Sequence, residues 1–293
     1  MNKQKINFKR AACLDVHSPI YLRTSNSKFC GGDIGDIYLL VDKASDAGFR
    51  FIQFTPAQDT GSNSCPYMGL SIFSYNPVYL SLSHLETLVD YKLIDKKIYQ
   101  EVLIDGLNHV SYSRLYKFKM AVLRSIYDRG DYPDKIKIAK YGHGVVAYAI
   151  FKALRDKFRL RWYHWSDEFK QANLLTILAN HPSLHREVKF HLFVQDVMKK
   201  QWLDLASYAK KKKIDFIFDK PIYPIHDSAD VWANQKLFYL NPTGTLKYGS
   251  GCDNPNDPFG AQYWGHAVYK FKENPNEVIK YYNESIKFMS QIA

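Results

Sequence analysis

The feature that most constrains the fold is a strand–helix–strand pattern near the start of the chain. Residues 11–17 (AACLDVH) predict a short buried strand, and residues 50–56 (RFIQFTP) predict the next one. Between them, residues 37–48 place apolar side chains at helical spacing and end in a glycine suited to a helix C-terminus. A helical crossover of this length joins parallel strands, so a parallel sheet is expected.

The same unit recurs later in the chain. Residues 194–213 predict an amphipathic helix that ends in a lysine run, and residues 214–218 (IDFIF) predict a strand followed directly by Asp219. Repeated βα units predict an α/β protein, with either an open sheet or a (β/α)₈ barrel of the TIM type.

The domain organisation follows from where the βα pattern is interrupted. Residues 1–82 are expected to hold the first βα units, and residues 83–190 a largely helical insertion or subdomain, because residues 82–94, 112–127 and 145–158 have helical periodicity. Residues 191–293 are expected to resume the βα units and to include a mobile substrate loop at 249–265, rich in glycine and aromatic residues.

The last residues predict an amphipathic helix, where a barrel would continue with another strand. Three or four βα units cannot close a barrel. The expected barrel is therefore incomplete within these 293 residues, with an open sheet edge.

Composition excludes several classes of function. The net charge of +11 invites a nucleic-acid-binding hypothesis, but the basic residues are spread among acidic ones, so no nucleic-acid partner is expected. No apolar run is long enough to span a bilayer, and no membrane partner is expected. The four scattered cysteines have no metal-ligand spacing and indicate reduced thiols in a cytoplasmic protein, with no metal site. No P-loop and no G-x-G-x-x-G motif follows a predicted strand, and no cofactor is expected.

Several residues are candidates for contact with a ligand, each with a structural alternative. Asp219 follows a predicted strand, where a barrel places its active-site groups, but it could equally cap the next turn. Ser228 could cap a short helix instead. Gln262 and Trp264 combine an amide with an aromatic ring, as sugar-binding loops do, although an ordinary surface loop would also contain them. Tyr67 lies in a turn-rich stretch after a predicted strand.

Three ordered motifs resemble the amylomaltase (4-α-glucanotransferase) family, glycoside hydrolase family 77. Residues 214–238 match its D-x-P-I, D-S-x-D-x-W pattern followed by a Phe. Residues 261–265 (AQYWG) are similar to the G-Q-W-G of its mobile loop. Residues 47–82 match its P-x-x-x-T-G, P-Y and S-x-F-x-x-N-P sequence. The resemblance covers the chain end to end, loosely in its helical middle.

The resemblance implies a (β/α)₈ barrel with helical insertions that transfers α-1,4-glucan segments between maltooligosaccharides through a glycosyl–enzyme intermediate. It assigns donor-sugar contacts to a set of five residues: Tyr67, Asp219, Ser228, Gln262 and Trp264. The family's nucleophile belongs to an R-x-D-H segment, and neither it nor the acid/base can be assigned within residues 1–293, so no catalytic residue is named here and this chain alone is expected to be inactive.

The sequence also departs from the family pattern and leaves alternatives open. Lys220 stands where an apolar residue is usual, and Cys65 replaces a serine before the Pro-Tyr pair. One alternative is a non-catalytic glucan-binding or degenerate fragment of such an enzyme. A further expectation is a second polypeptide that supplies the rest of the barrel.

Overall fold

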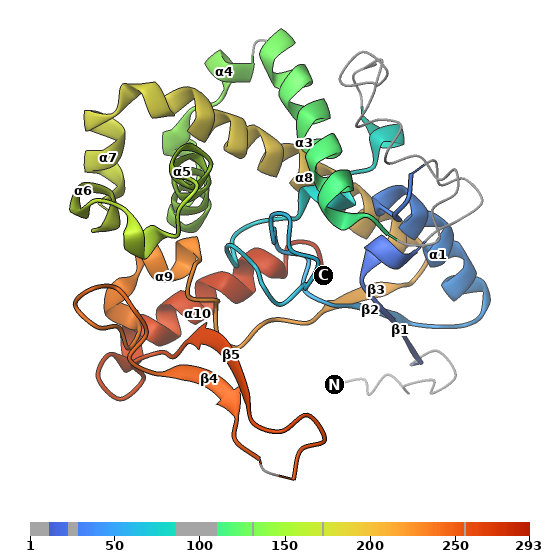
Figure 1. The fold of residues 1–293 in the computed structure, drawn as a ribbon. Coiled ribbons are helices and arrows are strands. Elements are labelled where there is room, and N and C mark those ends of the chain that lie inside the picture. Colours follow the sequence, from blue (N-terminus) through green and yellow to red (C-terminus); the bar gives the residue numbers. More distant parts are fainter. Residues whose placement is uncertain (1–11, 23–28, 86–109, 131, 172, 255) are drawn as a thin grey trace, which may run out of the picture.

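Three parallel strands form the sheet on which the fold is built (Figure 1). The structure is a computed structural model, and it describes residues 12–22, 29–85, 110–130, 132–171, 173–254 and 256–293. The strands lie in the order β1 (Cys13–His17), β2 (Phe51–Phe54) and β3 (Asp215–Phe218). This arrangement confirms the predicted parallel pairing of the three segments and makes the fold mixed α/β.

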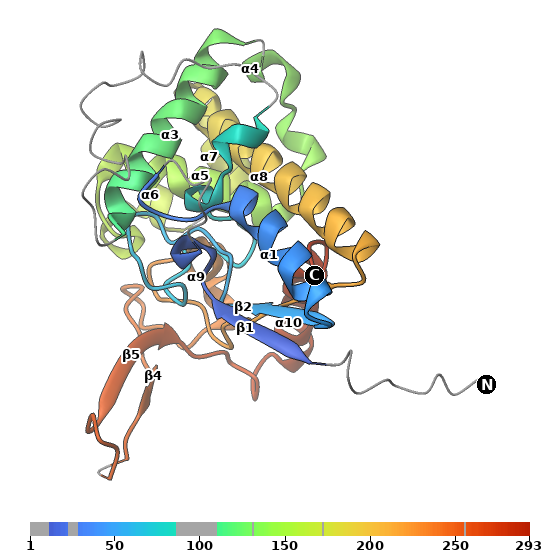
Figure 2. The same cartoon turned by 90° about the vertical axis from the view of Figure 1, so that its right-hand side faces the viewer.

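Helix α1 (Ile34–Asp46) forms the crossover between β1 and β2 (Figure 2). Asp33 caps its first turn, and Asp36 accepts a hydrogen bond from the backbone N–H of Asp33 in return, which completes a capping box. Gly48 follows the helix with φ 85°, a conformation that glycine adopts without steric cost. Local sequence signals therefore set both ends of this helix.

Helix α8 (His185–Lys211) joins the helical part of the molecule to the sheet. Its buried Trp202 packs edge-on against Phe54 of β2, with ring centroids 6.4 Å apart. The expected domain boundary at residue 190 falls inside this continuous helix. The reason is that α8 begins at residue 185, nine residues before residue 194, where the sequence predicted the helix to start.

The other helices described between β2 and α8 gather above the sheet in Figure 1. They are α3 (Tyr112–Arg129), α4 (Tyr132–Lys135), α5 (His143–Phe158), α6 (Asp167–Lys170) and α7 (Leu174–Asn180). The helices expected at 112–127 and 145–158 are present as α3 and α5. Of the third expected helix, at 82–94, residues 82–84 form a 3₁₀ turn, and residues 86 onward lie outside the described residues.

The C-terminal part contains α9 (Ala229–Ala233), strands β4 (Gly249–Cys252) and β5 (Gln262–Ala267), and α10 (Pro275–Met289). The segment expected to be an irregular loop at 249–265 instead forms an antiparallel two-stranded ribbon, which projects from the body of the molecule (Figure 2). A Cβ on Gly251 would lie 2.2 Å from the carbonyl oxygen of Gln262, so the strands approach closely only because this residue is glycine.

None of the helices in the described part of the chain is both long and apolar enough to cross a bilayer.

Candidate functional site

The centre of the candidate site is a hydrogen bond between two residues predicted from sequence. Asp219 follows β3 directly, and its backbone N–H continues the parallel ladder by donating to Phe54 O at 2.9 Å. Its carboxylate accepts a hydrogen bond from the Tyr67 hydroxyl at 2.5 Å. That bond, together with burial, raises the pKa of Tyr67 to about 12, so the hydroxyl remains a donor at neutral pH. The pair lies at the C-terminal edge of the sheet, where βα folds place their ligands.

The loop that carries Tyr67 is held from two sides by buried carboxylates. Asp59 accepts hydrogen bonds from the Gly61 N–H at 2.8 Å and from the Tyr148 hydroxyl of α5 at 2.5 Å. Asp230 of α9 accepts from the Ile72 N–H at 2.9 Å and from the hydroxyl of Tyr281 on α10. Desolvation raises the pKa of Asp230 to about 6. The loop is thus a fixed platform for Tyr67.

The ribbon presents the second part of the candidate site. Gln262 and Trp264 lie two residues apart on β5, and therefore on the same face of the strand. The Trp264 indole N–H donates to the side-chain oxygen of Gln262 at 3.0 Å, and the indole ring remains 49% exposed. Two further aromatic rings on the ribbon, those of Phe259 and Tyr263, are also exposed.

The base of the ribbon adjoins the Tyr67 loop. His266 at the end of β5 forms a bridge to Ile225, which follows the Asp219 segment. Burial lowers the pKa of His266, while the neighbouring backbone of Tyr67 acts in the opposite direction. The structure therefore brings the Tyr67–Asp219 pair and the base of the Trp264 strand to one region of the molecule.

Ser228 occupies a different position from the one expected of a sugar contact. It is fully buried; its hydroxyl donates to Ile225 O at 2.6 Å and accepts from the Val231 N–H at 3.3 Å. It is the N-cap of α9. Direct contact between Ser228 and a ligand is therefore not supported. The Ser228 hydroxyl is occupied by the hydrogen bonds of the helix cap, and the residue is buried in the core.

Two residues near the site were missed or undervalued in the sequence. Asp15 of β1 lies close enough to Tyr67 to add to the rise of the Tyr67 pKa, and its signal was a carboxylate within a predicted strand. Lys220 carries its amine beneath the surface, 3.6 Å from the centre of the Tyr282 ring. Burial lowers the pKa of Lys220 to about 8.

No group of three metal-binding side chains occurs within the described residues. Two histidines that are close in the sequence form hydrogen bonds within the protein. His181 Nε2 lies 2.7 Å from the Glu168 carboxylate, and His185 Nε2 lies 2.9 Å from Leu178 O.

The chemistry of this region suits a polyhydroxylated ligand. Asp219 can accept a hydrogen bond from a hydroxyl, Tyr67 and Gln262 offer further polar atoms, and Trp264 offers an apolar face for the C–H side of a sugar ring.

Comparison with known proteins agrees with this chemistry. Residues 19–293 match the sequence profile of the 4-alpha-glucanotransferases, glycoside hydrolase family 77. The chain belongs to this family.

Individual 4-alpha-glucanotransferases are similar to the chain over most of its length. The protein from Clostridium butyricum is 33% identical over 242 residues, which is 79% of this chain and 48% of that protein. The one from Aquifex aeolicus (strain VF5) is 28% identical over 258 residues, which is 86% of this chain and 52% of that protein. The chain thus spans about half the length of the curated relatives it matches.

A solved structure in the family has the same fold. The amylomaltase from Streptococcus agalactiae, determined in complex with acarbose, superposes with a TM-score of 0.74 at 23% sequence identity. The match covers 95% of this chain and 57% of that one. At 23% sequence identity, this similarity shows a shared fold.

Proposed function

We propose that residues 1–293 form the donor-glucan-binding part of a 4-alpha-glucanotransferase that acts on α-1,4-glucans such as maltooligosaccharides. The observation that carries the proposal is the Tyr67–Asp219 hydrogen bond at the C-terminal edge of the parallel sheet, next to the base of an aromatic ribbon. In this proposal Tyr67 holds Asp219 in the orientation in which its free oxygen accepts a glucosyl hydroxyl. Trp264 packs against an adjacent sugar ring, and Gln262 orients the indole.

The proposed architecture is part of a (β/α)₈ barrel. Its support is the order β1–β2–β3 with a helical crossover after β1, together with the amylomaltase fold of the structural neighbour. The helices from α3 to α7, which separate β2 from β3 in the chain, are proposed as the insertion in that barrel. The ribbon is proposed to move over bound glucan, because its exposed aromatic rings become covered only when a ligand lies beneath them.

The reaction proposed for the whole enzyme is a retaining transfer. Such a transfer takes one carboxylate as nucleophile and a second carboxyl group as acid and base, roughly 5 Å apart across the scissile bond. Neither role is assigned to a residue of this chain. A cytoplasmic location is part of the same proposal, supported by four cysteines that all remain free thiols.

Titration of the chain with maltoheptaose in a calorimeter tests the binding role. Asp219→Asn should weaken binding by about tenfold or more, because it removes a charge-assisted hydrogen bond to a sugar hydroxyl. Tyr67→Phe should weaken it by about fivefold, because Asp219 loses the donor that orients it. The control is Asp128→Asn, which removes a carboxylate paired with Arg186 at the end of α3. Equal affinity in the Asp219 variant and the control would refute the proposal.

A further inference from the structure

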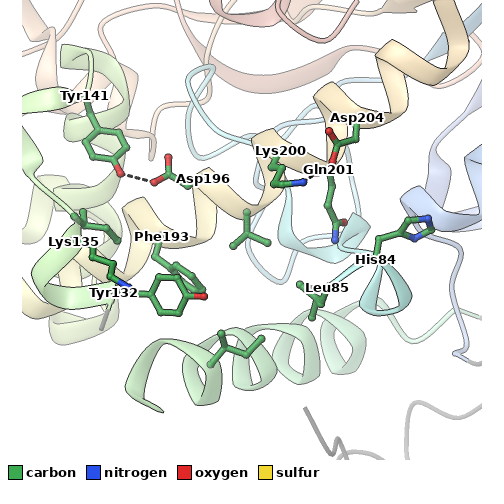
Figure 3. Close-up of a pocket in the computed structure, with 13 residues that line it drawn as sticks. His84, Leu85, Tyr132, Lys135, Tyr141, Phe193, Asp196, Lys200, Gln201 and Asp204 are labelled. Atoms are coloured by element: carbon green, nitrogen blue, oxygen red, sulfur yellow. Dashed lines mark hydrogen bonds and ion pairs between the residues drawn. The ribbon is translucent and has the colours of Figure 1, made fainter. Parts of the chain in front are cut away.

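A cavity of about 420 Å³ lies between helices α3 and α8 (Figure 3). We call it the α3–α8 cavity. Its walls come from the turn at residues 82–85, the second half of α3, the stretch from α4 to residue 141, and the middle of α8. None of the five residues assigned to glucan lines it. Its volume is typical of a site for a small ligand.

The elements that form the α3–α8 cavity are joined by side-chain contacts. Arg124 of α3 donates two hydrogen bonds to the Glu187 carboxylate of α8, at 2.5 and 3.2 Å. Gln201 of α8 binds both backbone groups of Ser81, which directly precedes the turn. These contacts form the cavity without a ligand, so binding requires little rearrangement of the helices.

One side of the cavity is apolar and aromatic. Ile126 of α3 and Phe193 and Val197 of α8 line it. Figure 3 shows the Tyr132 ring beside that of Phe193, with ring centroids 4.5 Å apart. Phe193 is buried, whereas Tyr132 is only half-buried and keeps part of its ring accessible. An accessible aromatic ring in a cavity suits the C–H side of a sugar ring.

Two polar pairs line the same cavity, and each joins a carboxylate of α8 to a donor. Asp196 accepts a hydrogen bond from the Tyr141 hydroxyl at 2.5 Å (Figure 3). Asp204 accepts one from the Lys200 amine at 2.9 Å, and both side chains of this pair are more than half exposed. A carboxylate beside a donor suits two neighbouring hydroxyl groups, because one hydroxyl can donate to the carboxylate while the other accepts from the donor.

Charge and spacing narrow the class of ligand. Among the described residues that line the cavity, two aspartates face two lysines, Lys135 and Lys200. An ion would meet no surplus of opposite charge there, so the balance favours an uncharged ligand. Asp196 and Asp204 are eight residues apart on α8, or about 12 Å along the helix axis. A single sugar ring is too short to reach both pairs.

We propose that the α3–α8 cavity is a second carbohydrate-binding site, which binds two or more linked rings of an uncharged oligosaccharide. One ring packs against Tyr132. Hydroxyl groups of the ligand bind the Asp196–Tyr141 pair at one end and the Asp204–Lys200 pair at the other. The assignment rests on the lining of this cavity alone, and therefore goes beyond the proposed transferase function.

Calorimetric titrations of the full chain, with and without Asp219→Asn, test the proposal. Maltopentaose and cellopentaose serve as probes, because both are chains of five uncharged glucose rings that differ in their linkage. At least one of them should still bind when Asp219→Asn has weakened the candidate glucan site, and the preferred linkage identifies the sugar. Binding of neither probe to the Asp219→Asn chain at millimolar concentrations would overturn the proposal.

A double variant locates the site. Asp196→Asn with Asp204→Asn should weaken binding of the preferred probe by about tenfold or more, because an amide is a weaker acceptor than a carboxylate. The matched control is Asp128→Asn with Asp167→Asn, which removes the same charge from two ion pairs outside the cavity. Both double variants are made in the Asp219→Asn chain. Equal affinity in the two would refute the proposed location.

A further variant tests the aromatic contact without changing a charge. Tyr132→Leu keeps an apolar side chain against Phe193 but removes the flat ring, and should weaken binding of the probe by several-fold. Thermal unfolding of each variant shows whether the chain still folds. A folded Tyr132→Leu chain with unchanged affinity would refute the assignment of a sugar ring to Tyr132.

Discussion

At the scale of single residues, Lys220 is a charged side chain whose burial costs desolvation free energy. The position follows Asp219, and its amine is buried without a hydrogen-bond partner in the described part of the chain. The face of the Tyr282 ring attracts the ammonium and offsets part of the desolvation cost. Attraction from Asp230 also favours the charged form, yet burial dominates and the pKa falls to about 8. An apolar side chain at this position would avoid the conflict.

Lys220→Met is therefore expected to raise the free energy of unfolding near neutral pH, by on the order of 1 kcal/mol. Because the pKa of Lys220 is lower in the folded state than in the unfolded state, the unfolded state binds more protons between about pH 8 and pH 10.5. The unmodified chain should accordingly gain stability as pH rises through this window, and the variant should not. Urea denaturation at about pH 7 and about pH 10 measures both effects. A variant less stable than the parent at neutral pH would show that the cation–π contact outweighs desolvation.

At the scale of elements, one long helix and one buried carboxylate hold the loop at residues 55–85, which follows β2. Gln195 and Gln201 of α8 each bind both backbone groups of a loop residue, those of Tyr75 and Ser81. Asp230 of α9 ties the same loop to α10 through Ile72 and Tyr281. The loop is well positioned, because side chains from α8 and α9 satisfy several of its backbone groups.

Asp230→Ala should lower the free energy of unfolding by about 3 kcal/mol, because it leaves the Ile72 N–H and the Tyr281 hydroxyl buried without an acceptor. The folded-state pKa of Asp230 is raised to about 6, so the part of its stabilisation that comes from proton binding is full below about pH 4 and is lost as pH rises through 6, whereas the two hydrogen bonds it accepts remain. Denaturation curves between these two pH values should show this loss in the parent chain and not in the variant. An Asp230→Ala chain as stable as Asp128→Ala would contradict the anchoring role.

The ribbon supports a prediction about ligand binding. Trp264→Ala should weaken maltoheptaose binding by about tenfold, because the exposed ring loses its stacking contact with sugar. Stability should change little, since the ring lies outside the core. Leu175→Ala on α7 removes another exposed apolar side chain, away from the ribbon, and should leave binding unchanged. Calorimetry on both variants decides whether the ribbon contacts glucan; equal affinities would exclude Trp264.

At the scale of the whole molecule, the described structure combines a sheet, a helical part and a ribbon, and the candidate glucan site lies where the sheet edge meets the ribbon (Figure 1). Glucan binding and bond transfer are separable requirements. In the proposed function, binding uses the polar and aromatic groups of the candidate site, whereas retaining transfer also needs a nucleophilic carboxylate and a proton donor.

Residues 1–293 alone are expected to give no disproportionation. Incubation of the purified chain with maltotriose should produce neither glucose nor longer maltodextrins, because positioned proton transfer and covalent catalysis together supply most of the rate. The 4-alpha-glucanotransferase of Clostridium butyricum serves as the positive control. Clear formation of both products by the pure chain would show that it contains the carboxylates that have not been assigned.

Sequence by itself determined the helices and strands that are specified by residues within or next to them. The crossover helix α1, the strands on either side of it and the strand before Asp219 follow from periodicity, from the cap at Asp33 and from Gly48, all within a few residues of each element. The parallel pairing followed from the length of the crossover. The choice of Tyr67, Gln262 and Trp264 as candidate contacts depended on motif resemblance, and periodicity alone would not have selected them.

Only the tertiary structure decided what depends on packing between distant segments. Tyr67 and Asp219 are 152 residues apart, and Tyr281 and Asp230 are 51 apart, so no local pattern predicts either bond. The ribbon at 249–267 escaped prediction because its glycines lack strand periodicity, and cross-strand pairing stabilises it instead. For Ser228 the sequence offered both a ligand contact and a helix cap, and packing buries it as the cap of α9. Burial is a property of the assembled chain, and it is burial that separates these structural groups from those available to bind.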